Sequence, residues 1–309
     1  MNFSLIIPVF NNSESIDELF IKIKSVFDNF NANQKHKLEI IFVDDFSKDS
    51  SIKKIETLLH DDFIKIKLIS LKINHGQRLA TLIGLKKATF DKLIVMSADL
   101  QDDPEYLLNF FKKFISGSQL IVGMRSETNE NILKRFTSWI HYKLIRIEIK
   151  KYPLNGTDFY GFDRKIFEEY IAIDNYFLNL ADLFKVSESY DFFYYKKKKR
   201  KHGKSQYNFL TRLDLSLDQI ICTCRWPLRL LMFMGSLLAF FSLLSILVLI
   251  FIYFYYGTPI TGWRSAISTM LFFFGILLFS ISLLSEYIYR ILIILRKPNI
   301  ESIKYIKDI

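Results

Sequence analysis

The chain has 309 residues, a formal net charge of +10 and two cysteines, Cys222 and Cys224. Its length suits one large domain with an appendage. The two cysteines form a C-x-C pair without nearby Cys or His partners, which argues against a zinc site and a disulfide scaffold. A reducing compartment is therefore expected. The basic charge is compatible with nucleic acid, anionic lipid or a phosphorylated substrate as partner.

Apolar runs and helix-like segments alternate along the first 125 residues. The expected strands are 3–9, 38–43, 64–71 and 93–96, and the expected helices are 13–30 and 77–88. Because the strands are almost wholly apolar, both faces of their sheet should be covered. This alternation predicts an α/β fold with a mostly parallel, doubly wound sheet. The first run lacks the basic flank of a signal peptide, so the N-terminal domain is expected to stay in the cytoplasm.

Two apolar stretches in the C-terminal third are each long enough to cross a membrane, which needs about 20 residues. The first is 228–256 and the second is about 266–289, and a short loop joins them. Arginines and lysines gather outside the two stretches, whereas the loop holds only Arg264. The positive-inside rule therefore predicts an integral protein of the cytoplasmic membrane with two spans, both termini and the N-terminal domain being cytoplasmic.

The segment ahead of the first span carries both charge and helical periodicity. Cations are concentrated at 196–201, and apolar residues recur at helical spacing from 207 to 221. The cations indicate either a solvated surface or a contact with anionic headgroups, and the helix either lies on the membrane or packs against the N-terminal domain. The predicted division is a cytosolic domain at 1–205, a juxtamembrane amphipathic region at 206–227, a transmembrane hairpin at 228–295 and a cytosolic tail at 296–309.

Polar residues directly follow several of the predicted strands, where doubly wound sheets bind their ligands. Asn11 follows the first strand, and Asp44 and Asp45 follow the second. Paired carboxylates at this place can hydrogen-bond a nucleobase or a ribose. A turn in which Ser47 caps the next helix explains the same residues, and both interpretations stay open.

The loop from Ser97 to Pro104 is the sharpest local signal of chemistry. Three carboxylates and an amide fall within five residues after a strand. Asp99 with Gln101 or Asp102 offers the hard oxygen ligands that Mg²⁺ and Mn²⁺ favour. An acidic loop that caps a helix through Asp102 or Asp103 is the alternative.

Five motifs in order carry a resemblance to a known family. They are IPVFN at 7–11, IFVDDFS at 41–47, NHG at 74–76, SADLQD at 97–102 and NGTDF at 155–159. Their order and spacing resemble the family 2 glycosyltransferases with a GT-A (Rossmann-like) fold, and among these the polyprenyl-phosphate glycosyltransferases, which include dolichol-phosphate mannose synthases and bactoprenol glucosyltransferases. The two-span hairpin and SEYIYR at 285–290 resemble the bactoprenol subgroup. The resemblance covers almost the whole chain.

The resemblance implies a role for individual residues by position. The residues implied to face the donor nucleotide are Pro8, Phe10, Asn11, Asp44, Asp45, Asn74, Gly76, Arg78 and Ser97. Those implied in catalysis are Asp99, Asp158, Arg125 and Arg135, and the implied ligands of Mg²⁺ or Mn²⁺ are Asp99 and Gln101. Those implied at the acceptor phosphate are Arg135, Arg200, Ser205 and Tyr207, the last three in an R-x-x-G-x-S-x-Y pattern.

The chain also departs from the family pattern. Ser97 occupies the position of the first Asp in the family's D-A-D motif, and Asn12 occupies that of an acidic residue. Phe46 replaces a glycine of the pattern and Gln77 a lysine. The Arg-Gly pair that the pattern has near 179–180 is missing. These departures leave the donor sugar open. They also keep a second interpretation open, in which a catalytically impaired relative acts as a membrane-bound scaffold or partner.

The expected activity is inverting transfer of a single sugar from a UDP- or GDP-sugar to polyprenyl (undecaprenyl) phosphate, at the cytoplasmic membrane face, for cell-surface glycan assembly or modification. A glycosyltransferase acting on another lipid-linked glycan is an alternative. A processive synthase is disfavoured because Arg225-Trp226 lacks a glutamine three residues earlier. Nucleic acid is not expected as a partner, since it leaves the acidic strand-end motifs unexplained. The resemblance implies a homo-oligomer, with a tetramer as one option.

Overall fold

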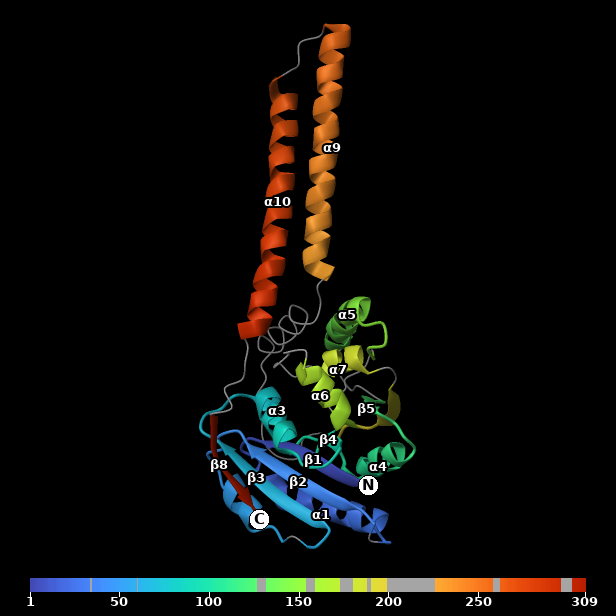
Figure 1. Ribbon diagram of the computed structural model, residues 1–309, viewed down its shortest axis with the longest axis vertical. Coiled ribbons are helices and arrows are strands. Elements are labelled where there is room, and N and C mark those ends of the chain that lie inside the picture. The colour runs from blue at the N-terminus through green and yellow to red at the C-terminus, as the bar shows by residue number, and fades with distance from the viewer. Residues whose placement is uncertain are drawn as a thin grey trace. The chain divides into compact units, whose positions relative to one another are not determined.

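A computed structural model describes residues 1–33, 35–59, 61–126, 132–153, 159–172, 180–187, 190–198, 226–257, 262–295 and 302–309. The chain divides into two compact units (Figure 1). The first unit comprises Met1–Leu217 together with Arg296–Ile309, and the second is Asp218–Leu295.

The first unit contains a mixed sheet in the order β7-β5-β6-β4-β1-β2-β3-β8. The strands are β1 (Asn2–Val9), β2 (Lys37–Asp44), β3 (Ile64–Leu71), β4 (Lys92–Val95), β5 (Leu120–Arg125), β6 (Phe159–Asp163), β7 (Asp191–Tyr195) and β8 (Ile303–Asp308). β1 pairs in parallel with β2 and β4, and β2 with β3, whereas β6 and β8 run antiparallel to their neighbours. The predicted α/β class with a mostly parallel sheet is confirmed.

Helices cover both faces of the central strands (Figure 1). The helical elements of this unit are α1 (Ser13–Phe30), α2 (Ser51–Glu56), α3 (Gln77–Lys87), η1 (Pro104–Tyr106), α4 (Leu107–Ile115), α5 (Ile132–Glu148), α6 (Arg164–Ala172) and α7 (Leu180–Val186). On the α3 face, a Cβ added to Gly84 would lie 2.6 Å from Ile6 Cγ2 and 2.9 Å from Val43 Cγ2. Glycine therefore lets α3 lie close to β1 and β2, and these largely apolar strands are buried on both faces as predicted.

The C-terminal residues form an edge strand of this sheet. β8 pairs antiparallel with β3, Ser70 lying opposite Tyr305, and the Lys72 amide donates to the Ser302 carbonyl over 2.8 Å. Lys307 Nζ also lies 2.9 Å from Glu56 Oε1 on α2. The chain thus leaves the first unit, passes through the two helices of the second, and re-enters the first unit's sheet.

The second unit contains two long helices, α9 (Trp226–Tyr256) and α10 (Gly262–Leu295), lying side by side (Figure 1). Both are long and apolar enough to cross a membrane. Small residues form their contact, since a Cβ on Gly275 would lie 2.6 Å from the Ala239 nitrogen and one on Gly235 would lie 2.8 Å from the Phe279 nitrogen. Ser242 Oγ adds a 2.7 Å hydrogen bond to the Ser268 carbonyl. Close backbone approach with a hydroxyl bond is a packing mode typical of membrane helices.

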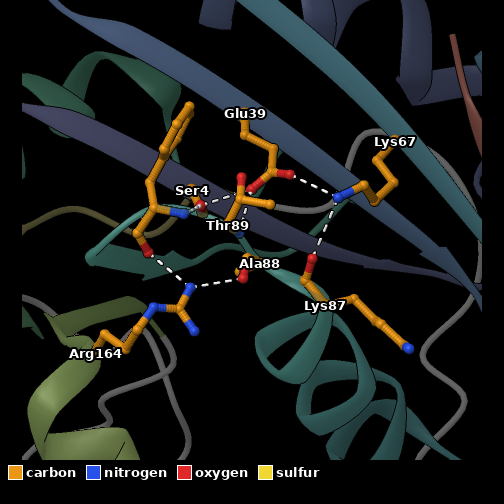
Figure 2. A network of polar contacts seen from close by, with 8 residues as sticks. Ser4, Glu39, Lys67, Lys87, Ala88, Thr89 and Arg164 are labelled. Atoms are coloured by element: carbon orange, nitrogen blue, oxygen red, sulfur yellow. Dashed lines mark hydrogen bonds and ion pairs between the residues drawn. The ribbon is translucent and has the colours of Figure 1, made fainter.

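A buried polar network ties the amino ends of the central strands to the loop that enters β4 (Figure 2). Glu39 on β2 accepts from Ser4 Oγ at 2.8 Å, from Lys67 Nζ at 2.8 Å and from the Thr89 amide at 2.9 Å. Arg164 Nη2 donates to the carbonyls of Ala88 and Phe90, at 2.6 and 2.8 Å. The network therefore holds residues 87–90, which lead into β4, the strand that precedes the loop beginning at Ser97.

A chain that ends at residue 301 loses β8 and leaves the backbone groups of β3 that face β8 unpaired, whereas the pairing of β3 with β2 remains. We expect its thermal unfolding midpoint in detergent to fall, and the amides of β3 to exchange faster with deuterium. The control is Lys304→Ala, because Lys304 is exposed and its substitution leaves the backbone pairing intact. Equal exchange of β3 amides in the truncated and full-length chains would contradict the pairing.

Glu39→Gln tests the buried network through its pH dependence. Burial opposes the charge of Glu39, but hydrogen bonds from Lys67, Thr89 and Ser4 outweigh it, and the pKa of Glu39 lies below its ordinary value of 4.5. A lowered pKa contributes stability above the unfolded value and loses it as the pH falls. The wild type should therefore be more stable than the variant by about 1–3 kcal/mol at pH 7.

This difference should shrink between about pH 5 and pH 3. Thermal unfolding of both proteins across that range measures it. The matched control is Glu18→Gln, which breaks the partly exposed Lys22–Glu18 pair on α1 and should change stability little. A difference that stays constant with pH would rule out the ionised Glu39 as the stabilising group.

Candidate functional site

Three loops converge at the carboxyl ends of β1, β2 and β4. The Asp45 amide, just after β2, donates to the Val9 carbonyl at the end of β1 over 2.8 Å. Ser15 Oγ, in the first turn of α1, donates to the Ala98 carbonyl in the loop after β4 over 2.7 Å. The parallel pairing of β2 and β4 with β1 brings these loops to one edge of the sheet, as the sequence predicts.

Each of these loops contains a residue with a strained backbone. Among the described residues, the non-glycine residues with positive φ are Asn11 at 53°, Phe46 at 65° and Leu100 at 57°, one in each loop. Such conformations cost about 1–3 kcal/mol each and occur where the surroundings impose them. Phe46 stands where the family pattern has glycine, which adopts this conformation without strain. Hence the departure at this position leaves the turn in place and adds strain to it.

Side chains hold the strained β1–α1 and β2–α2 loops to each other. The Asn11 amide donates to Ser47 Oγ at 2.9 Å, and Asn11 Oδ1 accepts from the Lys48 amide at 2.8 Å. The Asn12 amide donates to Ser51 Oγ at 3.0 Å. Asn12, where the family pattern has an acid, also accepts from the Phe10 amide at 3.0 Å. The two loops therefore form one cross-linked surface next to the buried Pro8.

Asp44 and Asp45 are buried, and their carboxylates bind backbone amides. Asp44 accepts from the Ser47 amide at 3.2–3.3 Å, and Asp45 accepts from the amides of His75 and Gly76 at 2.7 and 2.8 Å. Burial raises the pKa of both carboxyls above the ordinary value, although these hydrogen bonds oppose the shift. Asp45 thereby holds the loop with Asn74 and Gly76 at the start of α3, which brings two further predicted nucleotide residues to the same edge.

The loop after β4 contains a hydrogen-bonded acidic group. Ser97 Oγ lies 3.0 Å from Asp99 Oδ1 and 2.7 Å from Asp102 Oδ2. Asp99 Oδ1 also accepts from the Gln101 amide at 3.2 Å, and Asp102 Oδ1 accepts from the Tyr195 hydroxyl at 3.0 Å. Asp102 is fully buried whereas Asp99 is half-buried. Asp99 is therefore the carboxylate of this pair that a ligand can reach.

Asp103 caps a helix, as the alternative interpretation of this loop proposed. Its side chain accepts from the Glu105 amide at 3.3 Å at the start of η1. Lys198 Nζ forms an ion pair with Asp103, and the Lys198 amide donates to the Gln101 carbonyl at 2.9 Å. Burial acts to raise the pKa of Asp103, but the Lys198 and Glu105 bonds outweigh it and the pKa lies below its ordinary value. One lysine of the cation run thus contacts the acidic loop itself.

The residues of the loop after β4 fit a cation that the protein and a ligand coordinate together better than a cation that the protein coordinates alone. Within the described ranges, no three His, Cys, Asp or Glu side chains could hold a metal ion together. Mg²⁺ and Mn²⁺ sites with one or two protein carboxylates complete their coordination with substrate phosphates and water. Asp99 and Gln101 are suited to such a partial site.

The remaining predicted site residues lie on β5, α3 and α5 or outside the described residues. Arg125 ends β5 and lies opposite Tyr195 in the register with β7, and Arg78 is in the first turn of α3. Arg135 lies on α5, of which only the backbone is described there. The predicted residues outside the described segments are Asp158, Arg200, Gly203, Ser205 and Tyr207. No sequence motif pointed to Tyr195, which lies 93 positions from its partner Asp102.

Comparison with known proteins establishes the family. Residues 4–174 match the family model described as "Glycosyl transferase family 2". The chain therefore belongs to glycosyl transferase family 2, and the resemblance found in the sequence motifs is confirmed. The predicted fold class, a GT-A sheet domain followed by two long apolar helices, is confirmed as well.

Relatives align over almost the whole chain. The "Uncharacterized glycosyltransferase YkcC" of Bacillus subtilis (strain 168) is 30% identical over 298 residues, which cover 94% of this chain and 90% of that protein. The "Bactoprenol glucosyl transferase" of Shigella phage SfV is 30% identical over 296 residues, which cover 95% of each. The chain is also similar to a solved structure of glucosyl-3-phosphoglycerate synthase from Mycobacterium tuberculosis in complex with Mn²⁺, uridine diphosphate and glucosyl-3-phosphoglycerate. The match covers 72% of this chain and 78% of the synthase chain, at 15% identity and a TM-score of 0.48.

Asp45→Asn tests the role of Asp45 in holding the β3–α3 loop. Asparagine replaces one of the two carboxylate oxygens by an NH₂ group, so in the same side-chain orientation one of the two backbone amides faces a donor and loses its acceptor. We expect a loss of stability of about 1–3 kcal/mol and faster deuterium exchange at His75 and Gly76. Asp62→Asn, at an exposed position, is the control. Unchanged protection of those two amides would show that Asp45 does not hold the loop.

Proposed function

We propose that this protein transfers a single sugar, with inversion, from a UDP- or GDP-sugar to polyprenyl phosphate at the cytoplasmic face of a membrane. The observation that carries the proposal is the similarity to a bactoprenol glucosyl transferase over 95% of both chains, which includes the two apolar helices as well as the sheet domain. The cross-linked loops at the ends of β1, β2 and β4 support it, since this edge is where such sheets bind nucleotides.

The donor nucleotide is assigned to the surface formed by the three loops. Its base and ribose contact the strained loops after β1 and β2, with Pro8, Phe10 and Asn11 on one side and the loop held by Asp45 on the other. Arg78 and Ser97 complete this set. Loops that hydrogen bonds already hold in place lose little further conformational entropy when the ligand binds.

The donor diphosphate is assigned to Asp99 and Gln101, where Mg²⁺ or Mn²⁺ is the expected cofactor. The cation, when bound, neutralises charge that develops on the departing diphosphate. Asp99 is half-buried beside Ser97, so it can receive a cation that the diphosphate also binds. Arg125 and Arg135 are assigned as further cations for the phosphates, which arginine binds well through its planar fork.

The chemical step needs little base catalysis. An oxygen of the acceptor phosphate attacks the anomeric carbon, the bond from that carbon to the diphosphate oxygen breaks, and the nucleoside diphosphate leaves with the electron pair. A phosphate monoester is largely ionised at pH 7, with a second pKa of about 6, so the nucleophile is already formed. Asp158 is therefore assigned to orient the acceptor, and Arg200, Ser205 and Tyr207 to bind its phosphate.

The path of the chain supports placement at a membrane face. Since β8 belongs to the same sheet as β1–β7, the two ends of the helical hairpin lead back to one unit. If both helices cross the bilayer, both ends lie on one side, and the cations outside the hairpin assign that side to the cytoplasm. Assembly of a homo-oligomer through the exposed apolar faces of α9 and α10 is part of the proposal.

Transfer by the purified full-length protein tests the proposal. A panel of radiolabelled UDP- and GDP-sugars is offered with undecaprenyl phosphate and Mg²⁺ or Mn²⁺, and one donor should give a lipid that carries a single sugar. Asp99→Asn should lower the rate by about 100-fold or more, because it removes charge stabilisation of the leaving group. Asp28→Asn, exposed on α1, is the matched control and should keep the wild-type rate.

Two outcomes would count against this proposal, one against the role of Asp99 and one against the function itself. Full activity of Asp99→Asn would remove Asp99 from catalysis. Absence of product with every donor, from folded protein, would reject transfer to polyprenyl phosphate and favour the scaffold interpretation that Ser97 and the missing Arg-Gly step keep open.

A further inference from the structure

The described part of α5 and the turn after it have a buried side. Ile145 on the helix and Ile149 just beyond its end are buried. The rings of Tyr142 and Tyr152 lie 6.2 Å apart between centroids, and Phe184 on α7 packs edge-on against Tyr152 at 5.3 Å. These contacts anchor one side of α5 to the first unit, so its opposite side faces outward.

The outward side of α5 exposes large apolar side chains together with cations. Trp139 is 45% exposed and Ile147 is 56% exposed. Scattered exposed apolar residues are ordinary on a protein surface, whereas a group on one face marks an interaction site. Spacings of three, four and seven positions along a helix place residues on one side. The α5 outer face comprises Trp139, Ile140, Lys143, Arg146 and Ile147 on the helix and Lys150 in the turn after it, all of them exposed.

The composition of the α5 outer face fits a lipid surface better than a protein partner. Lys143 Nζ lies over the Trp139 ring, 4.5 Å from its centroid, so a cation and an aromatic ring are presented together. Residues 139–151 hold four cations and one carboxylate, which gives a formal charge of +3. Tryptophan is enriched at membrane–water interfaces, and cations bind anionic headgroups. Lysine, in contrast, is depleted from protein–protein interfaces.

The chain also brings a bilayer within reach of this face. α9 and α10 are each long and apolar enough to cross a membrane. The first unit includes the chain on both sides of this helical pair, so it is tethered at both ends of the hairpin. A tethered surface meets the bilayer at a high effective concentration, and contacts that are weak by themselves are then sufficient for binding.

We propose that the α5 outer face binds the anionic phospholipid surface of the bilayer that α9 and α10 cross, with its apolar side chains in the headgroup layer and its cations against lipid phosphates. The inference rests on the membrane placement in the proposed function and adds a contact made by the sheet unit. Arg135, assigned to the acceptor phosphate, lies four positions before Trp139 on α5. A bound α5 therefore keeps this arginine's position on the helix close to the layer that holds lipid phosphates.

Spin-label accessibility in the full-length protein tests the inference. The protein, with Cys222→Ser and Cys224→Ser as background, is reconstituted in nanodiscs that contain phosphatidylglycerol or only phosphatidylcholine. A nitroxide is attached at Ile147→Cys, and the matched control is Ile21→Cys, an isoleucine that is 65% exposed on α1. A label at Phe273→Cys, on an exposed position of α10, reports the bilayer interior. Molecular oxygen concentrates in lipid, whereas a nickel chelate stays in water.

The label at position 147 should favour collisions with oxygen in nanodiscs that contain phosphatidylglycerol. It should lose much of this preference in phosphatidylcholine alone and at high salt, because salt screens the attraction between cations and headgroups. The label at position 21 should favour the nickel chelate under all these conditions. A label at 147 that responds as the label at 21 does would overturn the inference.

Removal of charge tests the role of the cations. Lys143→Gln combined with Lys150→Gln should shift the equilibrium between bound and released α5 by about 5-fold for each cation, so the label at 147 should meet the nickel chelate more often. Lys37→Gln combined with Lys65→Gln changes two exposed lysines outside α5 and should keep the wild-type response. An unchanged response in the α5 variant would overturn the assignment to an anionic surface.

A protein partner on this face gives a third response. If a second copy of the chain or another protein covers the α5 outer face, the label at 147 is shielded from oxygen and from the nickel chelate alike. Shielding from both reagents would overturn the assignment to lipid.

Failure of the inference and failure of the proposed function give different results. If the wild type transfers sugar and the label at 273 lies in lipid, but the label at 147 stays in water, the inference is wrong and the function stands. If the wild type transfers no sugar, the accessibility measurements still decide the inference, since they need no donor. If the label at 273 also stays in water, the inference and the membrane placement are both overturned.

Discussion

Parallel pairing of β2 and β4 with β1 is the constraint on which the rest of the structure depends. It brings the ends of three strands to one edge, and all three loops that follow carry residues of the candidate site. The pairing is stabilised on one face by α1 and α4 and on the other by α3, which Gly84 allows to lie close to Ile6 and Val43. At the opposite edge, the Glu39 network fixes the entry to β4.

The loops at this edge combine strain with dense hydrogen bonding. Asn11, Phe46 and Leu100 adopt left-handed conformations that most residues avoid, at about 1–3 kcal/mol each. Bonds between Asn11 and the 47–48 turn, and from Asp45 to the α3 loop, offset part of that cost. Strain that its surroundings impose is typical of surfaces that must be ordered before a ligand arrives, which agrees with a site for a nucleotide and its diphosphate.

The parts of the fold that local pattern determines were predictable. The helix expected at 13–30 is α1, and the strands expected at 3–9 and 64–71 are β1 and β3, because long apolar runs can be buried in few ways. β8 was missed, since its short sequence IKYIKD has neither a long apolar run nor a regular alternation and becomes a strand through pairing with β3. At the site, the motifs located the loops, but the bond from Tyr195 to Asp102 depends on packing between segments far apart in sequence. The assignments of Asp158, Arg200, Ser205 and Tyr207 stay predictions.

An experimental structure of the full-length protein with a nucleotide-sugar and Mn²⁺ tests the central claim most directly, namely that the edge formed by β1, β2 and β4 binds the donor. The expected result is a nucleotide lying across the loops after these strands, with its diphosphate and the cation at Asp99. A nucleotide bound elsewhere on the chain, or a cation held by residues that exclude Asp99, would contradict the account.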